Sequence, residues 1–224
     1  MIRSFAVLNL DAKGTAKGMA HPGFFYIDAL GVIREKFFEP DELDRFTPNN
    51  VVARLFPELA EEVSRDVEAP HLRLTLAQSD RIASPGNQFS LVVEVELPPG
   101  VHVYAPEAQG YKPIQLVIRK SPEFALDSVA YPKSKVLYLE AIREQVPVFE
   151  GKFCITQDAT VTTAQDFVRT LASDGNTIML EGELRYQACD KTVCYPPTSV
   201  PVKWQLKVLP LDRQRSPEGI QHQG

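Results

Sequence analysis

Near its C-terminus the chain reads YQACDKTVCYPP (residues 186–197), which places Cys189 and Cys194 five positions apart. On both sides of this stretch apolar and polar residues alternate, a pattern typical of half-buried strands. The apolar positions are Ile178, Leu180, Leu184, Tyr186 and Ala188 before the cysteines, and Val200, Val202, Trp204, Leu206 and Val208 after them. We therefore predict a β-hairpin that carries the two cysteines at its tip.

The parity of the first predicted strand puts Cys189 on the polar face, together with Glu183 and Arg185. A structural cysteine is usually buried, so we expect two accessible thiols that can form a disulfide and exchange it. Two other interpretations are a static disulfide that staples the hairpin and a metal site. A zinc site needs four ligands, but the sequence has no second close cysteine pair and its four histidines are scattered.

The third cysteine, Cys154, lies in the stretch KFCI (residues 152–155), where we expect a small core residue on a strand. Three cysteines are too few for a secreted disulfide scaffold.

Composition limits the classes of function. The chain has 224 residues, 44% of them apolar, and a net charge of -5, so it lacks the basic surface typical of nucleic-acid binding. No apolar run approaches the roughly 18 residues of a membrane span, and we expect no direct membrane insertion. The first ten residues hold too short an apolar core for a signal peptide. We expect no metal and no other cofactor.

Residues 71–209 repeat the period of two in several short segments, separated by turns such as Pro85-Gly86 and Pro99-Gly100. This pattern predicts an antiparallel β-sandwich. The side chains expected to point inward include Leu74, Val93, Val95, Leu116, Leu184, Val202 and Trp204. Residues 131–148 break the pattern and are interpreted as a long loop, while the polar residues 210–224 are interpreted as a disordered tail.

Residues 1–59 carry mixed α/β signals. Two strands are predicted at 24–28 and 32–38, and a helix is predicted to begin at Thr47, with Pro48 in its first turn. Apolar residues follow at helical spacing, at Val51, Val52, Leu55, Phe56 and Leu59. The charged residues 60–70 are interpreted as a linker.

Residues 71–209 resemble the N-terminal domain of the thiol:disulfide interchange protein DsbD. The most specific match is the stretch 186–197 followed by Val200–Val202, supported by residues 100–104, 131–133 and 148–151. The resemblance implies an immunoglobulin-like fold and a periplasmic location. It also implies thioredoxin-like partners, a membrane-embedded electron donor, and Cys194 as the residue that enters the mixed disulfide.

The resemblance also suggests a set of residues around the catalytic pair Cys189 and Cys194. The expected neighbours are His102, Tyr104, Tyr186, Lys191, Tyr195 and Pro196. The family has a movable cap loop over its cysteines, and residues 135–145 hold that position. The apolar cap residues are Val136, Leu137, Leu139 and Ile142.

Residues 1–59 resemble the C-terminal half of a peroxiredoxin- or thioredoxin-like redoxin domain, on the stretches 5–9 and 20–34. In such domains the proline before the strand is cis, and Pro22 holds that position. The half that carries the redoxin cysteine is missing from this stretch, so we expect an incomplete domain and either an internal start at Met1 or a fragment. The expected fold class is mainly β: an immunoglobulin-like antiparallel sandwich after an α/β fragment of a thioredoxin-like fold.

The sequence thus predicts a thiol:disulfide oxidoreductase that passes reducing equivalents between thioredoxin-like partners through Cys189 and Cys194. Two alternatives remain open. One is a non-catalytic immunoglobulin-like binding module with a structural disulfide. The other is the reductant domain of a truncated peroxiredoxin-like peroxidase.

Overall fold

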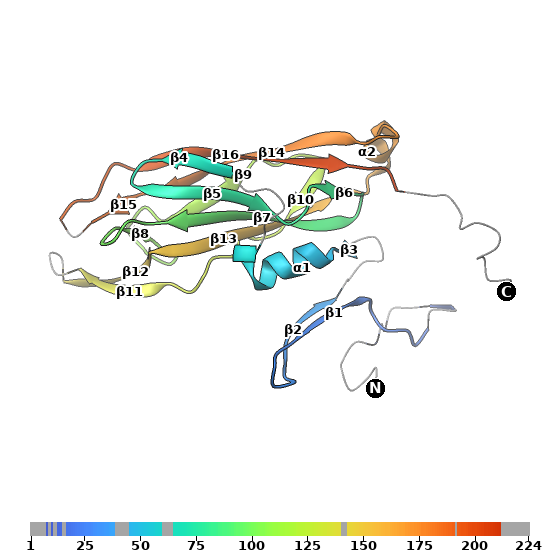
Figure 1. Ribbon diagram of the computed structural model, residues 1–224, viewed down its shortest axis with the longest axis horizontal. Helices are drawn as coiled ribbons and strands as arrows, with labels where there is room; N and C mark the ends of the chain where they lie inside the picture. Colours follow the sequence, from blue (N-terminus) through green and yellow to red (C-terminus); the bar gives the residue numbers. More distant parts are fainter. Residues whose placement is uncertain are drawn as a thin grey trace.

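The protein is mainly β and is built from antiparallel sheets (Figure 1). A computed structural model describes residues 8, 10, 13–14, 17–38, 45–59, 65–139, 143–190 and 192–211. Among these residues, every strand pairing is antiparallel except two short parallel ones, β3 with β7 and β6 with β16. The expected antiparallel architecture is therefore confirmed.

Two of the sheets supply the main core, and a third lies at one end of them (Figure 1). The first has the order β10-β13-β7-β5-β4, with β3 also beside β7, and its strands are β3 (Arg45–Phe46), β4 (Arg65–Ala69), β5 (Leu72–Gln78), β7 (Asn87–Glu96), β10 (Phe124–Leu126) and β13 (Lys152–Val161). The second has the order β6-β16-β14-β9, with β6 (Ile82–Ala83), β9 (Gln115–Ile118), β14 (Asn176–Tyr186) and β16 (Thr198–Val208). The third has the order β11-β12-β8-β15, with β8 (His102–Tyr104), β11 (Lys135–Leu139), β12 (Glu144–Glu150) and β15 (Ala188–Cys189).

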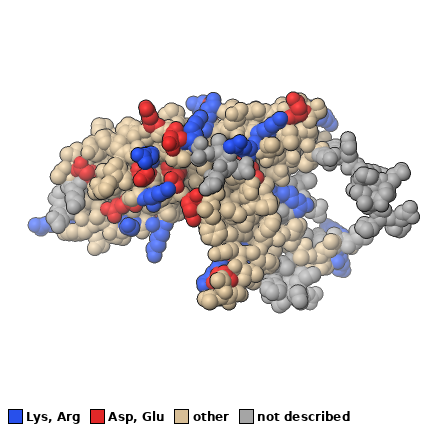
Figure 2. Space-filling view, in the orientation of Figure 1, with Lys and Arg blue, Asp and Glu red and all other residues tan. Residues whose placement is uncertain are grey.

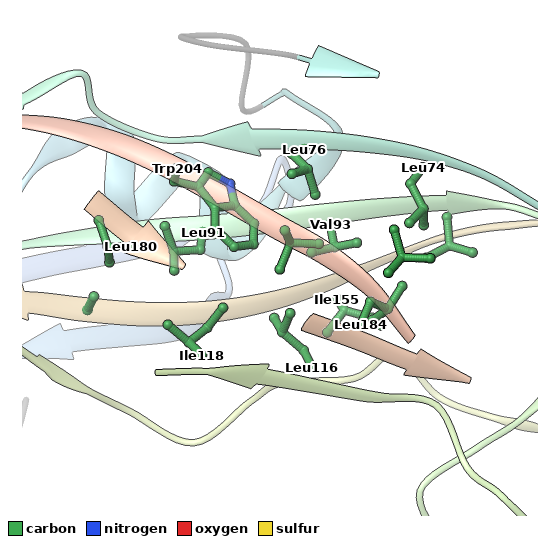
Figure 3. Close-up of a cluster of buried hydrophobic side chains, with 14 of the residues drawn as sticks. Leu74, Leu76, Leu91, Val93, Leu116, Ile118, Ile155, Leu180, Leu184 and Trp204 are labelled. Atoms are coloured by element: carbon green, nitrogen blue, oxygen red, sulfur yellow. The ribbon is translucent and has the colours of Figure 1, made fainter. Parts of the chain in front are cut away.

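The core lies between the first two sheets (Figure 3). Leu74, Leu91 and Val93 come from the first sheet, and Leu180 and Trp204 from the second. All seven residues expected to point inward are buried: Leu74, Val93, Val95, Leu116, Leu184, Val202 and Trp204. The Trp204 indole N–H donates a hydrogen bond to the carbonyl oxygen of Ala77 at 2.8 Å, which satisfies its one polar group inside the core.

The hairpin predicted from the sequence is present. Strands β14 and β16 pair over their whole length, from Asn176 opposite Val208 to Tyr186 opposite Thr198. In β16 buried and exposed residues alternate, because one face of the strand packs on the core and the other faces solvent. The connection after Tyr186 carries both cysteines.

Part of the expected linker is a strand instead. Residues 65–69 form β4, which pairs with β5 from Arg65 opposite Leu76 to Ala69 opposite Leu72. The strand is short and charged, as is common at the edge of a sheet, while Val67 and Ala69 pack against the core. Residues 60–64 lie outside the described residues.

The expected long loop over 131–148 contains a second hairpin. Strands β11 and β12 pair antiparallel from Lys135 opposite Val148 to Leu139 opposite Glu144, and β12 continues into the third sheet beside β8. The sequence signal was weak because both faces of β11 carry apolar side chains, Leu137 on one and Val136 on the other.

The first 59 residues contain the expected strands and helix. Strands β1 (Gly23–Ile27) and β2 (Ile33–Phe38) form an antiparallel pair. Helix α1 (Pro48–Leu55) has Thr47 as its N-cap, whose hydroxyl accepts a hydrogen bond from the Asn50 amide at 2.9 Å. A single 3-10 turn, η2 (Pro57–Leu59), follows, and a second short helix, α2 (Gln165–Thr170), precedes β14.

Helix α1 packs on the outer face of the first sheet. Its buried residues are Asn50 and Ala53, whereas Val52 is exposed. The Asn50 side-chain amide donates hydrogen bonds to the Ser90 hydroxyl at 2.9 Å and to the Asp158 carboxylate at 3.2 Å. These bonds explain why a polar residue is buried there.

Two other expectations for the ends of the chain have different outcomes. The described residues contain no cis peptide bond, so Pro22 does not show the cis proline of the redoxin resemblance. Residues 212–224 of the expected tail lie outside the described part of the chain.

Acidic and basic side chains are interspersed on the face seen in Figure 2. Elsewhere in the sandwich, exposed pairs cross between strands, such as Arg73 on β5 with Glu96 on β7 at 3.4 Å. Such pairs contribute little to stability, and this face shows no large field of one sign.

Candidate functional site

The two cysteines form a disulfide at the end of the sandwich that carries the third sheet. Their Sγ atoms are 2.09 Å apart and their Cα atoms 4.0 Å apart. The chain leaves the second sheet after Tyr186, and Ala188 and Cys189 form strand β15, which pairs with β8 of the third sheet. Ala188 packs on the main core, while Cys189 packs on a second apolar cluster.

The expectation that Cys189 lies on an exposed polar face is wrong. Its side chain is 1% exposed. The parity argument holds only while the strand stays paired with β16, and that pairing ends at Tyr186, opposite Thr198. By contrast, Cys194 is exposed. One sulfur of the disulfide is therefore shielded by protein and the other belongs to a solvent-accessible residue.

The loop between the cysteines is organised by Asp190. Its carboxylate accepts hydrogen bonds from the amides of Thr192 and Val193, at 2.7 and 2.8 Å, and from the hydroxyls of Thr192 and Tyr195, at 2.8 and 2.9 Å. This is the side chain-to-backbone pattern that favours Asp in tight turns. Because these bonds favour the charged form, those from the backbone most strongly, they hold the pKa of Asp190 well below its usual range.

Tyr195, a predicted neighbour, follows the loop and fixes its far end. The hydrogen bond to Asp190 raises the pKa of its phenol. Its ring stacks on His71, with ring centroids 3.7 Å apart and planes 10° apart. His71 has a positive φ of 65°, which is uncommon outside glycine, and it lies in the turn between β4 and β5. The strand that replaces the expected linker thus brings a residue to the site.

Tyr104 lies directly against the disulfide. Its phenolic oxygen is 3.4 Å from Sγ of both Cys189 and Cys194. Burial raises the pKa of Tyr104, so the phenol keeps its proton at neutral pH and can donate a hydrogen bond to a sulfur anion. Its ring also contacts Tyr111, with centroids 4.4 Å apart, and His102, at 5.7 Å.

The β11–β12 hairpin covers the buried side of the disulfide. Leu137 and Leu139 pack against the second cluster, whose buried members are Tyr104, Ala108, Val146, Val148 and Cys189. At the turn end of the hairpin, the Tyr111 hydroxyl donates a 2.6 Å hydrogen bond to Glu144, which raises the pKa of this phenol to about 12. Two of the expected cap residues therefore lie over the site.

A third expected cap residue, Val136, does not lie over the site. Val136 points away from the cluster and is 67% exposed, as is its neighbour on the same face, Tyr138, at 54%. Ile142 lies outside the described residues.

The other predicted neighbours that the structure describes, Tyr186, Pro196 and His102, have different surroundings. Tyr186 is buried in the main core, and its hydroxyl donates to the carbonyl oxygen of Pro70 at 2.7 Å. Pro196 is exposed at the end of the loop, and Lys191 lies outside the described residues. His102 is buried beside the disulfide strand, and burial lowers its pKa.

Sequence reasoning missed several residues around the disulfide: His71, Tyr111, Glu144, Glu150 and the structural role of Asp190. Only Asp190 had a usable signal, because an Asp followed closely by Thr is typical of a turn that the side chain closes. The others come from turns and strands that are distant in the sequence, and they have no local pattern.

The free cysteine, Cys154, is half-buried at the edge of a small cluster formed by Ala53, Ala77 and Val92. Cys154 is on a strand, as expected, but it lies outside the main core. Burial, helped by nearby Glu94 and Glu58, raises the pKa of its thiol to about 11, so it stays protonated and unreactive at neutral pH. Among the described residues there is no group of three or more His, Cys, Asp or Glu side chains that could hold a metal ion.

A comparison with known protein families decides the classification. Residues 74–204, more than half of the chain, match the family of the N-terminal domain of the thiol:disulfide interchange protein DsbD. The chain belongs to this family. Thiol–disulfide exchange is the activity that the family implies, and the pair available for it is Cys189 and Cys194.

Solved structures from this family are similar only at a distance. The N-terminal periplasmic domain of ScsB from Proteus mirabilis has a TM-score of 0.42 and 14% identity over 61% of this chain and 49% of that chain, so this chain spans about half of its length. The reduced DsbD N-terminal domain from Neisseria meningitidis has a TM-score of 0.34 and 16% identity, over 52% of this chain and 82% of that one.

A structure from outside the family has a comparable score. The GAE domain of GGA2p from Saccharomyces cerevisiae has a TM-score of 0.35 and 7% identity, over 62% of this chain and 94% of that one. No curated protein sequence matches the chain. In the described part of the structure, no helix is long and apolar enough to cross a membrane.

Proposed function

We propose that this DsbD N-terminal-family chain passes reducing equivalents to and from thioredoxin-like proteins through Cys189 and Cys194, with Cys194 as the residue that forms the mixed disulfide. The observation that supports this direction of attack is the difference in exposure: Cys194 is exposed and Cys189 is 1% exposed. An incoming thiolate must reach the sulfur that it attacks.

Oxidation of a reduced partner takes two steps. A partner thiolate attacks Sγ of Cys194, the Sγ–Sγ bond breaks, and its electron pair remains on Cys189. The partner's second thiolate then attacks the partner's own sulfur in the mixed disulfide and displaces Cys194 as a thiolate. The partner leaves oxidised by two electrons and the chain becomes a dithiol. The same steps in reverse reduce an oxidised partner.

Two features of the site would support these steps. The Tyr104 phenol lies 3.4 Å from both sulfurs and can stabilise whichever one carries negative charge. The loop held by Asp190 keeps Cys194 presented to solvent without exposing Cys189. Family membership supports a periplasmic location and two kinds of partner, thioredoxin-like proteins and a membrane-embedded electron donor.

Single-cysteine variants test the proposal. The variant Cys189→Ala should capture a thioredoxin that lacks its second cysteine and carries a thionitrobenzoate leaving group on its first, giving a covalent complex that dithiothreitol releases, whereas Cys194→Ala should capture almost none. Cys194→Ala should also abolish disulfide transfer with thioredoxin while leaving the far-ultraviolet circular dichroism unchanged. If wild-type protein neither oxidises nor reduces thioredoxin, the static-disulfide or binding-module interpretation replaces this one.

We further propose that residues 1–59 derive from a redoxin-like fold. The order of β1, β2 and α1 supports this, whereas the trans peptide before Pro22 and the packing of α1 on the sandwich do not. Limited proteolysis tests it: a 1–59 fragment that folds cooperatively on its own would contradict an incomplete domain.

A further inference from the structure

Three residues on adjacent strands of the third sheet form a row that ends at the disulfide. In the strand register, His102 on β8 lies directly opposite Glu150 on β12 and directly opposite Cys189 on β15. Side chains that are directly opposite on neighbouring strands share one face of the sheet, with Cβ atoms about 4.5–5.5 Å apart. In the register of this sheet His102 therefore occupies the position between a residue that carries a carboxylate and the buried cysteine, on the same face as both.

His102 is buried and incompletely satisfied. It is 3% exposed, and its Nε2 atom has no hydrogen-bond partner among the described residues. Buried polar atoms normally have a partner, so one without any is a candidate for a functional role. Its ring lies edge-on to Tyr104, the residue that contacts both sulfurs.

The charge state of His102 suits proton transfer. Four titratable groups are its neighbours: Glu150 from β12, Cys189 from β15, Tyr104 from its own strand and Asp190 from the disulfide loop. Burial lowers the pKa of His102, and Glu150 and Asp190 oppose this only in part. At neutral pH the imidazole is therefore uncharged and can accept a proton.

The chemistry of exchange requires such an acceptor. When the reduced chain reduces a partner, Cys194 first forms the mixed disulfide and Cys189 must then displace the partner. Only a thiolate can do this, and Cys189 is buried away from the water that would otherwise take its proton.

We propose that His102 is the proton acceptor for Cys189 and that Glu150 holds the imidazole in place. The S–H proton of Cys189 moves to His102, the sulfur electron pair forms the bond to Sγ of Cys194, and the bond from Cys194 to the partner breaks, with its electron pair leaving on the partner sulfur. In the opposite direction the imidazolium returns the proton to Cys189 as it leaves. This role rests on the proposed exchange function.

A small aromatic disulfide, dithionitrobenzoate, separates the two steps without a protein partner. Attack by Cys194 of the reduced chain releases one coloured thiolate, and attack by Cys189 on the resulting mixed disulfide releases a second. In stopped-flow absorbance the variant His102→Gln should slow the second release about 100-fold at neutral pH. The first release should stay within about twofold of wild type, because Cys194 itself faces solvent.

The pH profile distinguishes proton transfer from a structural role. With a neutral imidazole as the acceptor, the wild-type second release should be flat across the neutral range. In His102→Gln it should rise about tenfold per pH unit until the thiol itself ionises. Glu150→Gln should slow the second release by about threefold to tenfold. The matched control, His21→Gln, removes a histidine outside the sandwich and should behave as wild type.

Each outcome decides one question. A wild-type chain that gives only one release contradicts the exchange function itself. Two releases in wild type, with an unchanged rate and pH profile in His102→Gln, contradict the role of His102 and leave the exchange function standing. If His102→Gln fails to fold, the same measurements are made on His102→Asn, and the wild-type pH profile provides a second test. If the rate of the second release in wild type rises with pH throughout the neutral range, the role of His102 is contradicted.

Discussion

The two cysteines of one disulfide occupy opposite surroundings. Cys189 belongs to a strand and lies in an apolar cluster beneath the β11–β12 hairpin, whereas Cys194 belongs to a loop whose shape is set by the Asp190 carboxylate. The third sheet holds the buried Cys189, and the loop holds Cys194 at the surface. Two cysteines only five positions apart can therefore differ in burial, with Cys189 1% exposed and Cys194 in the exposed class.

The largest expected effect is on the single cysteines. Cys189→Ala leaves Cys194, and Cys194→Ala leaves Cys189, so each thiol can be alkylated alone. We expect iodoacetamide to react roughly 100-fold faster with the first variant, because the second reacts only when the hairpin opens. Equal alkylation rates in the two variants would contradict the difference in accessibility between Cys189 and Cys194.

The hairpin that covers Cys189 should account for much of this protection. In the Cys194→Ala background, the double change Leu137→Ala and Leu139→Ala should speed alkylation of Cys189 about tenfold, since it removes roughly 1.4 kcal/mol of half-buried apolar packing. The matched control is Val136→Ala with Tyr138→Ala, on the opposite face of the same strand. A similar acceleration in the control would mean that general loosening, and not uncovering, exposes the thiol.

The structure of the loop between Cys189 and Cys194 depends on the negative charge of Asp190. The pKa of this carboxylate is lowered in the folded protein, so its stabilising effect is present above the ordinary value of 3.8 and is lost as the pH falls below it. Asp190→Ala should reduce amide-exchange protection at Thr192 and Val193 about fivefold at neutral pH. Wild type should approach the variant in acid, and nuclear magnetic resonance exchange rates would show whether it does.

The smallest expected effect concerns the turn end of the β11–β12 hairpin. Tyr111→Phe removes the hydrogen bond to Glu144 and should speed alkylation of Cys189 about twofold. The pKa of Tyr111 is raised to about 12, so this bond is present below the ordinary value of 10 and is lost as the pH rises toward 12. In an ultraviolet titration the variant should have one fewer late-ionising phenol than wild type, while other phenols with a raised pKa, such as Tyr186, remain.

The main sheets could be predicted because their strands have one buried face. In β16 the alternation from Val200 to Val208 is unbroken, and every inward residue was identified from parity alone. Strand β4 could not be predicted, because five residues with three charges resemble a linker unless the neighbouring strand is known. Helix α1 was placed correctly by Thr47, but its buried side depends on Ser90 and Asp158, which lie far away in sequence.

The site was predictable in part. The cysteine pair and Tyr104 follow from the local sequence and the family resemblance. The burial of Cys189 does not, because it depends on where the strand leaves one sheet and joins another. The pairing of His102 with Glu150 depends on strand register, which is set by tertiary packing and not by either strand alone.

The position of Trp204 determines what the fluorescence of the protein can report. It is the single tryptophan of the chain, it is buried, and it lies opposite Leu180, whereas β14 reaches the disulfide end at Tyr186. At about 3.3 Å per residue the indole is about 20 Å from that end, too far for the sulfurs to quench it by contact. Its fluorescence should therefore report unfolding and stay silent to the redox state, which provides a built-in check of folding for every cysteine variant.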